Sequence, residues 1–257
     1  MSEIHPTAIV SPRAELAEDV TVGPWATIED NVVIGSGCRI DSNTLIAHGT
    51  RLGREVRVHH GAVVGTIPQD LKFKGEESLA VVGDRTVVRE YATINRGTAE
   101  RGETTLGQDC LIMAYAHVGH DCLLGNHVIM GNAATLAGHV EVHDYALLSG
   151  VLPVHQFVKI GAHCIIGGGF RVPQDICPYS LAAGYPLRIM GLNVVGLKRR
   201  GFSSEAVKVL RGAFKLLFFS GLNTSQAVDR IREELPSTAE IGTILDFIEQ
   251  SNRGLTK

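Results

Sequence analysis

Histidines are concentrated in one stretch of this 257-residue chain, because seven of its eleven histidines lie between residues 117 and 163. Imidazole ionises near neutral pH, so a histidine can act as a general base, and it is also a common zinc ligand. His120 stands out because a carboxylate, Asp121, follows it directly and could orient its ring. The stretch therefore predicts proton-transfer chemistry or a metal site, provided that the fold brings these side chains together.

The elements that must position them follow a repeat of six residues. An aliphatic side chain recurs at almost every sixth position from Ile4 to Val172, and the breaks fall at positions 70, 76 and 100. Helices repeat near 3.6 residues and strands alternate every two, so a period of six indicates short strands that each end at a corner. Hexapeptide repeats are typical of a parallel β-solenoid. Parallel crossovers are usually right-handed, so local physics alone favours that hand.

Two further repeat positions carry small residues. Four places after each aliphatic residue the side chain is mostly small, and four cysteines fall there: Cys38, Cys110, Cys122 and Cys164. We expect these to be buried packing residues rather than ligands. The fifth, Cys177, lies outside the repeat, and such scattered cysteines suit a reducing cytosol. Glycine often follows the aliphatic residue directly, as at Gly35 and Gly83, where we expect it to supply corners with positive φ.

The repeat also predicts which residues are neighbours. If one coil is three repeats, residues three repeats apart are stacked about 4.8 Å from each other. Gly138 then lies over His120, and His139 lies over Asp121. The residues predicted to share one corner are His117, His120, Asp121, His139 and Gln156.

This corner cluster allows three interpretations: a zinc site, a general base, or solvated surface histidines. Convergence of so many titratable groups favours a functional site. For base catalysis we expect His120 to be the base, with the unobstructed Gly138 N–H as an oxyanion donor. No serine or cysteine nucleophile accompanies the cluster, which favours direct transfer over a covalent enzyme intermediate.

Composition excludes other classes of function. The net charge of −3 shows no basic excess of the kind that nucleic-acid binding requires. No apolar run is long enough to span a membrane, and the first residues do not resemble a signal peptide. We therefore expect a cytoplasmic protein with no nucleic-acid partner and no membrane insertion.

Two domains are expected, a solenoid over residues 1–190 and a small helical domain over residues 191–257. Two polar stretches, near 65–81 and 95–105, break the repeat and are predicted to be excursion loops. Loops on a rigid scaffold often carry binding residues. The candidates that the first excursion offers are Gln69, Asp70 and Lys72.

Three short helices are predicted to close the C-terminal end of the solenoid. The first begins at Ser203 or Ser204, the second has a capping box formed by Asn223 and Gln226, and the third begins at Ser237. The run Lys198-Arg199-Arg200 precedes them and is either a charged turn or a phosphate-binding segment.

Several motifs occur in a fixed order along the chain. They are QDLKFKGE (69–76), INRGT (94–98), AHVGHDC (116–122), NAATLAGHV (132–140), VHQF (154–157) and LKRRGFS (197–203). With these motifs nearly the whole chain resembles the UDP-N-acetylglucosamine acyltransferases of lipid A biosynthesis. The resemblance implies an all-β left-handed parallel β-helix, a hexapeptide-repeat solenoid, with a small C-terminal α-helical domain. It also implies a homotrimer with active sites between neighbouring subunits.

The activity that the resemblance implies is transfer of an (R)-3-hydroxyacyl chain from acyl carrier protein to the 3-hydroxyl of UDP-N-acetylglucosamine. No metal and no cofactor are expected, because phosphopantetheine arrives on the carrier. By the same resemblance His120 is the general base, Asp121 orients it, Gly138 N–H binds the oxyanion and Gly168 sets acyl length. The residues implied to bind substrate are Gln69, Asp70, Lys72, His117, His139, His155, Gln156, Asn193, Arg199 and Arg200.

Two positions depart from the family pattern. Asn95 stands where many members have histidine, which leaves its role open. Val195 stands where some members have a glutamate near the uridine, so that contact is expected to be missing.

Three alternatives stay open. A trimeric β-helix carbonic anhydrase would bind zinc through interfacial histidines, although the cluster lacks an H-x4-H pair. A sister acyltransferase acting on a sugar amine would use the same base. A non-enzymatic scaffold would give no reason for the histidines to converge.

Overall fold

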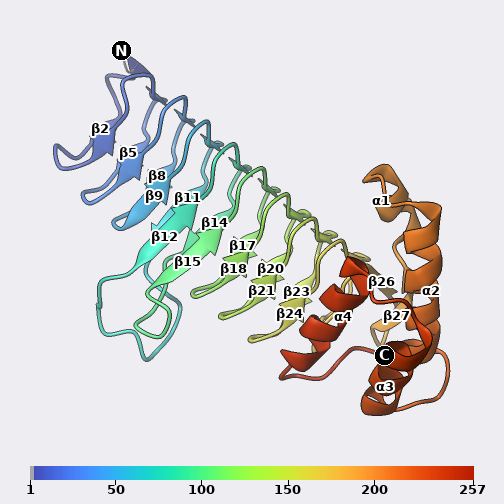
Figure 1. Ribbon diagram of the computed structural model, residues 1–257. Helices are drawn as coiled ribbons and strands as arrows, with labels where there is room; N and C mark the ends of the chain where they lie inside the picture. Colours follow the sequence, from blue (N-terminus) through green and yellow to red (C-terminus); the bar gives the residue numbers. More distant parts are fainter. Residues whose placement is uncertain (1–2) are drawn as a thin grey trace.

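The computed structural model describes residues 3–257, and residues 1 and 2 of the expected solenoid lie outside the described residues. Twenty-five short strands wind in order around a narrow coil (Figure 1). Strand order in each of three sheets advances by three, so each coil contributes one strand to each sheet, and all pairs within the coil are parallel. The chain is therefore a parallel β-helix. It is left-handed, as the resemblance implies, and does not have the right hand that parallel crossovers usually take.

The three sheets form the three faces of the coil. One contains β1 (Glu3–Ile4), β4 (Thr21–Val22), β7 (Arg39–Ile40), β10 (Arg57–Val58), β13 (Val87–Val88), β16 (Leu111–Ile112), β19 (Ile129–Met130), β22 (Leu147–Leu148) and β25 (Ile165–Ile166). The second contains β2 (Ile9–Val10), β5 (Thr27–Ile28), β8 (Leu45–Ile46), β11 (Val63–Thr66), β14 (Thr93–Asn95), β17 (His117–Val118), β20 (Thr135–Leu136) and β23 (Pro153–Val154). The third contains β3 (Glu15–Leu16), β6 (Val33–Ile34), β9 (Thr50–Leu52), β12 (Leu79–Val82), β15 (Glu103–Leu106), β18 (Leu123–Leu124), β21 (Glu141–Val142) and β24 (Lys159–Ile160).

Two excursions leave the coil without disturbing its register. Arg57 pairs with Arg39, three repeats earlier, but with Val87, five repeats later, so the first excursion adds two whole repeats. Val87 pairs with Leu111, four repeats later, so the second excursion adds one. Both insertions are whole multiples of the repeat, and this explains why the aliphatic series resumes in phase.

Both excursions are shorter than the polar stretches suggest. The first lies between β11 and β12, over residues 67–78, and the second lies between β14 and β15, over residues 96–102. The polar residues at their edges, such as Thr66 and Thr104, continue strands because their backbones pair with neighbouring coils. Backbone pairing rather than side-chain polarity sets where each excursion begins.

The interior of the coil is filled by the two inward repeat positions. From Val22 onward the large position is buried, as at Ile28, Ile94 and Leu136. The small position places the cysteines inside, and all five cysteines are buried and unpaired. Burial raises the pKa of the Cys122 and Cys164 thiols to about 12. They are packing residues, as the repeat predicts.

The expectation for the glycines that follow the aliphatic residues is wrong. Positive φ occurs instead at the third residue after the aliphatic one, in side chains as large as Trp25 and Tyr115. Gly35 and Gly83 do not have positive φ. A Cβ at Gly35 would lie 2.5 Å from the Gly53 carbonyl oxygen of the next coil, and a Cβ at Gly83 would lie 2.5 Å from the Gly107 carbonyl carbon. These glycines permit the close approach of stacked backbones.

The C-terminal end of the coil is covered by a hairpin and four helices (Figure 1). β26 (Ser180–Ala183) adds to β25 in parallel, and β27 (Arg188–Leu192) returns antiparallel. The helices are α1 (Val194–Arg199), α2 (Ser204–Phe218), α3 (Thr224–Glu234) and α4 (Ala239–Glu249). None of the described helices is long and apolar enough to cross a membrane.

Sequence reasoning missed the hairpin and α1, because both are too short to show a periodic apolar pattern. Ser203 caps α2, and the capping box of Asn223 and Gln226 is present at α3. The third predicted helix begins one residue later than expected, because Thr238 rather than Ser237 supplies the capping oxygen.

We predict that Gly83→Ala destabilises the coil and that Gly242→Ala does not. The new methyl group at position 83 meets backbone, which cannot move aside, and such overpacking costs about 1–3 kcal/mol. Gly242 lies in α4 with nothing within 4 Å of its ideal Cβ, so alanine should be neutral or mildly stabilising there. Thermal unfolding followed by circular dichroism compares the two. Equal midpoints would contradict the close-approach explanation.

Candidate active site

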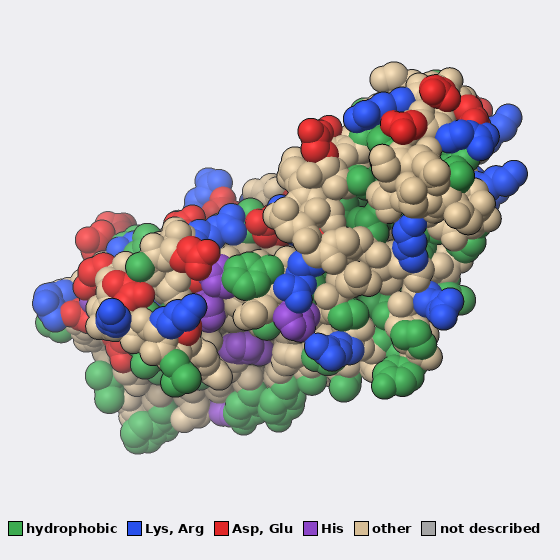
Figure 2. Space-filling model, turned by 90° about the horizontal axis from the view of Figure 1, so that it is seen from below, with side chains coloured by type: hydrophobic (Ala, Val, Ile, Leu, Met, Phe, Trp, Pro, Cys, Tyr) green, Lys and Arg blue, Asp and Glu red, His purple; other side chains and the backbone are tan. Residues whose placement is uncertain are grey.

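A cleft of about 530 Å³ opens where the two excursions face the corners of successive coils. The residues that line it are Gln69, Asp70, Lys72, Phe73, Glu76, Thr98, Ala99, Glu100, His120, His139, Gln156 and Phe157. Figure 2 shows histidine side chains gathered near the middle of this side of the molecule, close to acidic and basic side chains. Six residues that the sequence singled out therefore meet in one cleft, although they come from separate segments.

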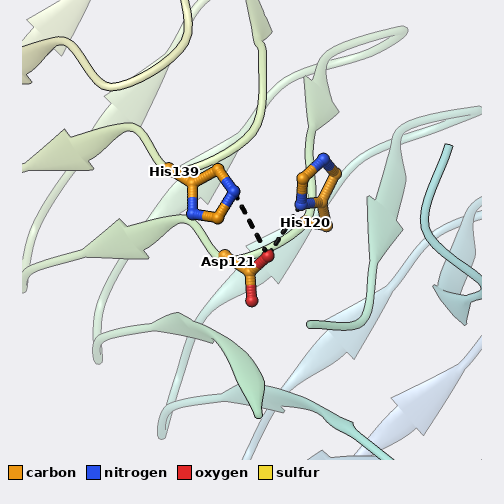
Figure 3. A group of neighbouring side chains, drawn as sticks. All are labelled: His120, Asp121 and His139. Atoms are coloured by element: carbon orange, nitrogen blue, oxygen red, sulfur yellow. Dashed lines mark hydrogen bonds and ion pairs between the residues drawn. The ribbon is translucent and has the colours of Figure 1, made fainter. Parts of the chain in front are cut away.

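His120 and His139 line the cleft, and the buried Asp121 contacts both of them (Figure 3). His120 Nδ1 lies 2.7 Å from Asp121 Oδ2, and His139 Nε2 lies 3.6 Å from the same oxygen. The two imidazoles meet edge to face with centroids 5.0 Å apart. Asp121 and His139 both have positive φ, at 58° and 61°, so the coil corners themselves aim these side chains.

The Asp121 carboxylate is fully buried yet favours its charged form. Burial by itself would raise its pKa, but hydrogen bonds from His120 and Thr98 outweigh burial and hold the pKa below its ordinary value. A carboxylate at His120 Nδ1 fixes the neutral ring with its proton on Nδ1. Nε2 is then left with its lone pair, and no hydrogen-bond partner for it is found in the part of the chain described. This is the arrangement that a general base requires.

Gly138 is required by the position of the His120 ring. A Cβ at residue 138 would lie 2.5 Å from His120 Cε1 and 2.6 Å from Nε2, so any side chain would displace the imidazole. The Gly138 carbonyl accepts from Phe157 N at 3.2 Å. The predicted stacking of Gly138 on His120 is confirmed, and it places this backbone beside the basic nitrogen.

His117 lies next to the cleft rather than in it. It belongs to β17, pairs with Thr135 as the repeat predicts, and its Nδ1 contacts Thr93 Oγ1 at 2.7 Å. Burial, and then the charge of His120, lower its pKa. It is therefore a neutral side chain at neutral pH, suited to hydrogen bonding rather than to binding a charge.

The two excursions are tied to each other at the rim of the cleft. Glu76 Oε1 accepts from Ala99 N at 3.1 Å, and its other oxygen accepts from Lys74 N at 2.8 Å. Asp70 Oδ1 accepts from Lys72 N at 2.9 Å, which holds the turn that carries both side chains. The candidate substrate-binding residues of the first excursion thus sit on a braced loop.

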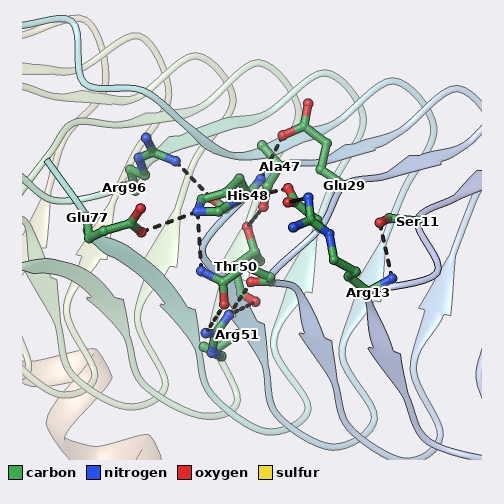
Figure 4. A network of polar contacts seen from close by, with 11 residues as sticks. Ser11, Arg13, Glu29, Ala47, His48, Thr50, Arg51, Glu77 and Arg96 are labelled. Atoms are coloured by element: carbon green, nitrogen blue, oxygen red, sulfur yellow. Dashed lines mark hydrogen bonds and ion pairs between the residues drawn. The ribbon is translucent and has the colours of Figure 1, made fainter. Parts of the chain in front are cut away.

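A polar network anchors the base of the first excursion to earlier coils (Figure 4). His48 Nδ1 contacts Asp30 Oδ1 at 3.0 Å and Nε2 contacts Glu77 Oε2 at 3.3 Å, while Arg96 donates to the His48 carbonyl at 3.1 Å. Asp30 is the main cause of a raised pKa at His48. The ring is therefore a cation over a wider pH range than a free histidine.

Asn95, whose role the sequence left open, belongs to the same anchor. Its Nδ2 donates to Thr66 Oγ1 at 3.0 Å and to the Ile67 carbonyl at 3.1 Å. Asn95 thus holds the start of the first excursion against β14.

Besides His117, five residues to which the resemblance gives binding or acyl-length roles do not line this cleft. Asn193 is buried and caps α1, accepting from Gly196 N and donating to the His163 carbonyl. Arg200 lies over the Tyr145 ring, 5.0 Å from its centroid, and donates to the Tyr145 carbonyl. The others are His155, Gly168 and Arg199, and Val195, the position that departs from the family pattern, does not line the cleft either. Among the described residues of one chain, these residues therefore do not share the cleft with His120 and Asp70.

Sequence reasoning did not single out Thr98, Glu76, Glu100 and Phe157, although all four line the cleft. Thr98 and Glu76 lie within the motifs INRGT and QDLKFKGE, but they lie on excursions, where the register of the coil predicts no neighbours. Phe157 stacks on His139 with centroids 4.5 Å apart. It lies exactly one coil after His139 in the sequence, so the register could have found it.

The three central side chains could also converge on a metal ion, since their ligand atoms lie within 4.8 Å of one another. Two ligands of a tetrahedral zinc, each about 2.1 Å from the ion, lie roughly 3.4 Å apart. The 2.7 Å contact of His120 with Asp121 is shorter and has the length of a charge-assisted hydrogen bond. The geometry fits a base held by a carboxylate better than a metal centre.

We predict that the first excursion loosens as pH rises. The raised pKa of His48 means that its contribution to stability is complete below about pH 6.5, its unfolded value, and is lost as pH rises through its folded pKa. Tryptic cleavage at Lys72 and Lys74 should therefore accelerate as pH rises above about 6.5, after normalisation to a free peptide of the same sequence. His48→Gln should cleave at one normalised rate throughout. If the normalised cleavage rate of the wild type did not change with pH, this role of His48 would be ruled out.

Comparison with known proteins places this geometry in a family. The family model described as Udp N-acetylglucosamine O-acyltransferase, Domain 2, matches residues 175–256. The bacterial transferase hexapeptide model matches residues 31–66 and 103–138.

Relatives match over the full length of the chain. Acyl-(acyl-carrier-protein)–UDP-N-acetylglucosamine O-acyltransferases of Leptothrix cholodnii and Paraburkholderia phymatum are 46% and 44% identical, with all of this chain and all of each relative covered. The crystal structure of a UDP-N-acetylglucosamine acyltransferase from Bacteroides fragilis matches with a TM-score of 0.98 and 44% identity, covering 99% of this chain and 100% of that one. The Arabidopsis enzyme matches with a TM-score of 0.87 and 33% identity over 99% and 100% of the two chains. Agreement of this extent confirms the resemblance, and the chain belongs to the UDP-N-acetylglucosamine O-acyltransferase family of enzymes.

Proposed function

We propose that this chain transfers an (R)-3-hydroxyacyl group from acyl carrier protein to the 3-hydroxyl of UDP-N-acetylglucosamine, the first step of lipid A biosynthesis. The observation that carries the proposal is the His120–Asp121 pair in the cleft, where no described residue forms a hydrogen bond with His120 Nε2. The names of the full-length relatives supply the two substrates. An assay with UDP-N-acetylglucosamine, its 3-amino analogue and carrier proteins bearing graded hydroxyacyl chains tests donor and acceptor together.

The proposed mechanism is direct transfer with His120 as general base. Nε2 takes the proton of the sugar hydroxyl as that oxygen attacks the thioester carbonyl. The Gly138 N–H donates to the oxyanion that forms, and buried Asp121 stabilises the imidazolium. When the tetrahedral intermediate collapses, the C–S bond breaks and His120 returns its proton to the leaving thiolate. No covalent enzyme intermediate is needed.

The cleft supplies groups for the sugar and the phosphates. Asp70, Gln69 and Gln156 offer acceptors and donors for hydroxyl and amide groups, and Lys72 offers a cation for the diphosphate. His139 faces both Asp121 and the cleft. His117 is proposed to support the reacting groups from the adjoining strand.

We further propose that the active enzyme is a homotrimer whose neighbours complete each site. His155, Asn193, Arg199 and Arg200, proposed for the nucleotide side, and Gly168, proposed to limit acyl length, lie outside the cleft of their own chain. One corner of the coil also carries large exposed apolar side chains, Trp25, Tyr91, Tyr115 and Val151, which are 65%, 46%, 63% and 64% exposed. Such a ridge supports burial against other copies.

We predict that His120→Ala lowers kcat by roughly 10²- to 10⁴-fold, the usual contribution of a general base. Circular dichroism and sedimentation should match the wild type, because His120 lies at the surface of the cleft rather than in the coil interior. His5→Ala, which removes an exposed histidine of the first coil, is the matched control and should retain full activity. Near-normal turnover by His120→Ala would exclude this base.

We predict that two inactive variants restore activity when they share a trimer. His120→Ala lacks the base, and an Arg199→Ala/Arg200→Ala double variant lacks the proposed phosphate contacts. If each site draws on two neighbours, trimers reassembled from equal amounts should recover about a quarter of the wild-type rate. Failure to recover, with mixed trimers verified by mass spectrometry, would place each complete site within one chain.

A further inference from the structure

We infer that Thr98 is a positioning residue for the proposed base, which it serves by clamping the Asp121 carboxylate against His120. The inference rests on the proposed function and adds to it a residue outside the His120–Asp121 pair. Thr98 lies on the second excursion, between β14 and β15, and is only 8% exposed.

Thr98 contacts both oxygens of the carboxylate. Its backbone N–H donates to Asp121 Oδ1 at 2.9 Å, and its hydroxyl donates to Oδ2 at 2.8 Å. The hydroxyl oxygen also accepts from Glu100 N at 3.2 Å. Because that contact uses an acceptor lone pair, the single hydroxyl proton is directed to the carboxylate.

The clamp is held from several sides. Thr104, in β15 just after the excursion, holds the Asp121 backbone and not its carboxylate, because its buried hydroxyl accepts from Asp121 N at 2.8 Å. Ala99, next to Thr98, donates to Glu76 of the first excursion at 3.1 Å. Thr98 is therefore fixed by the excursion that carries it and by the one that borders the cleft.

Three polar groups face the same oxygen of the Asp121 carboxylate and interact with its negative charge. Oδ2 faces His120 Nδ1 at 2.7 Å, the Thr98 hydroxyl at 2.8 Å and His139 Nε2 at 3.6 Å. Without the Thr98 hydroxyl, the Asp121 carboxylate would interact more strongly with the two imidazoles. The His120–Asp121 pair would therefore bind its next proton more tightly. Loss of one of two clamping bonds would also let the carboxylate rotate away from Nδ1.

These consequences separate positioning from substrate binding. Thr98 borders the cleft, but both of its polar groups are directed to Asp121. Removing its hydroxyl should therefore change turnover and pH dependence more than the KM for the sugar nucleotide.

The test compares Thr98→Val with Thr98→Ser in the intact enzyme, using kcat, KM and the pH profile of kcat/KM. Valine keeps the shape and removes the donor, while serine keeps the donor. A hydrogen bond to a charged group is worth about one pKa unit or more. Thr98→Val should therefore lower kcat about tenfold and move the acid limb of the kcat/KM profile upward by about one pH unit. Serine should restore both to near wild type, and KM should change less than about threefold in either variant.

Thr104→Val is the matched control, since it removes a buried threonine hydroxyl that meets the Asp121 backbone and not its carboxylate. Its acid limb should stay at the wild-type position. Should Thr98→Val fail to assemble, Thr98→Ala measures the same quantities. An unmoved acid limb in the Thr98 variants, or a serine variant as impaired as the valine one, would overturn the inference. A wild-type protein that transfers no acyl group would instead refute the proposed function.

Discussion

Parallel backbone pairing between coils is the constraint on which this structure depends. Each strand is so short that its position along the chain is held by stacking on the coils above and below, three repeats away where no excursion intervenes. Stacked backbones approach closely enough that a methyl group at Gly35 or Gly83 would meet backbone atoms. A scaffold with so little freedom can place side chains from successive coils at fixed separations. His120, Asp121 and His139 are placed in this way, at the same corner of two successive coils.

The candidate site is built where this regular stacking is interrupted. Excursions that add two repeats and one repeat leave the coil in register and supply side chains that no corner could supply. Asp121 shows why they are needed. A fully buried carboxylate is costly unless its charge is met by donors, and Thr98 on the second excursion provides two of them. The excursion that covers Asp121 therefore also keeps it charged.

The proposal of a homotrimer starts from the division of the predicted residues between separate places on one chain. The base, its carboxylate and the first-excursion residues share one cleft, whereas Asn193 and Arg200 are engaged near α1 with His163 and Tyr145. A narrow coil exposes three corners that cannot face one another within one chain. The proposed homotrimer would let residues on different corners meet one substrate, and the exposed apolar ridge at one corner supports this proposal.

The sequence by itself determined the coil, its register and its core, because a six-residue period leaves only one way to bury the aliphatic positions. It also placed Gly138 against His120 and His139 against Asp121, since stacking converts sequence separation into distance. Tertiary structure alone decided where the excursions fold, that Thr98 holds Asp121, and that positive φ falls three residues after the aliphatic position. Excursions lie outside the repeat, so their contacts depend on the surfaces they meet. The cluster was therefore predictable, and the groups that hold it in place were not.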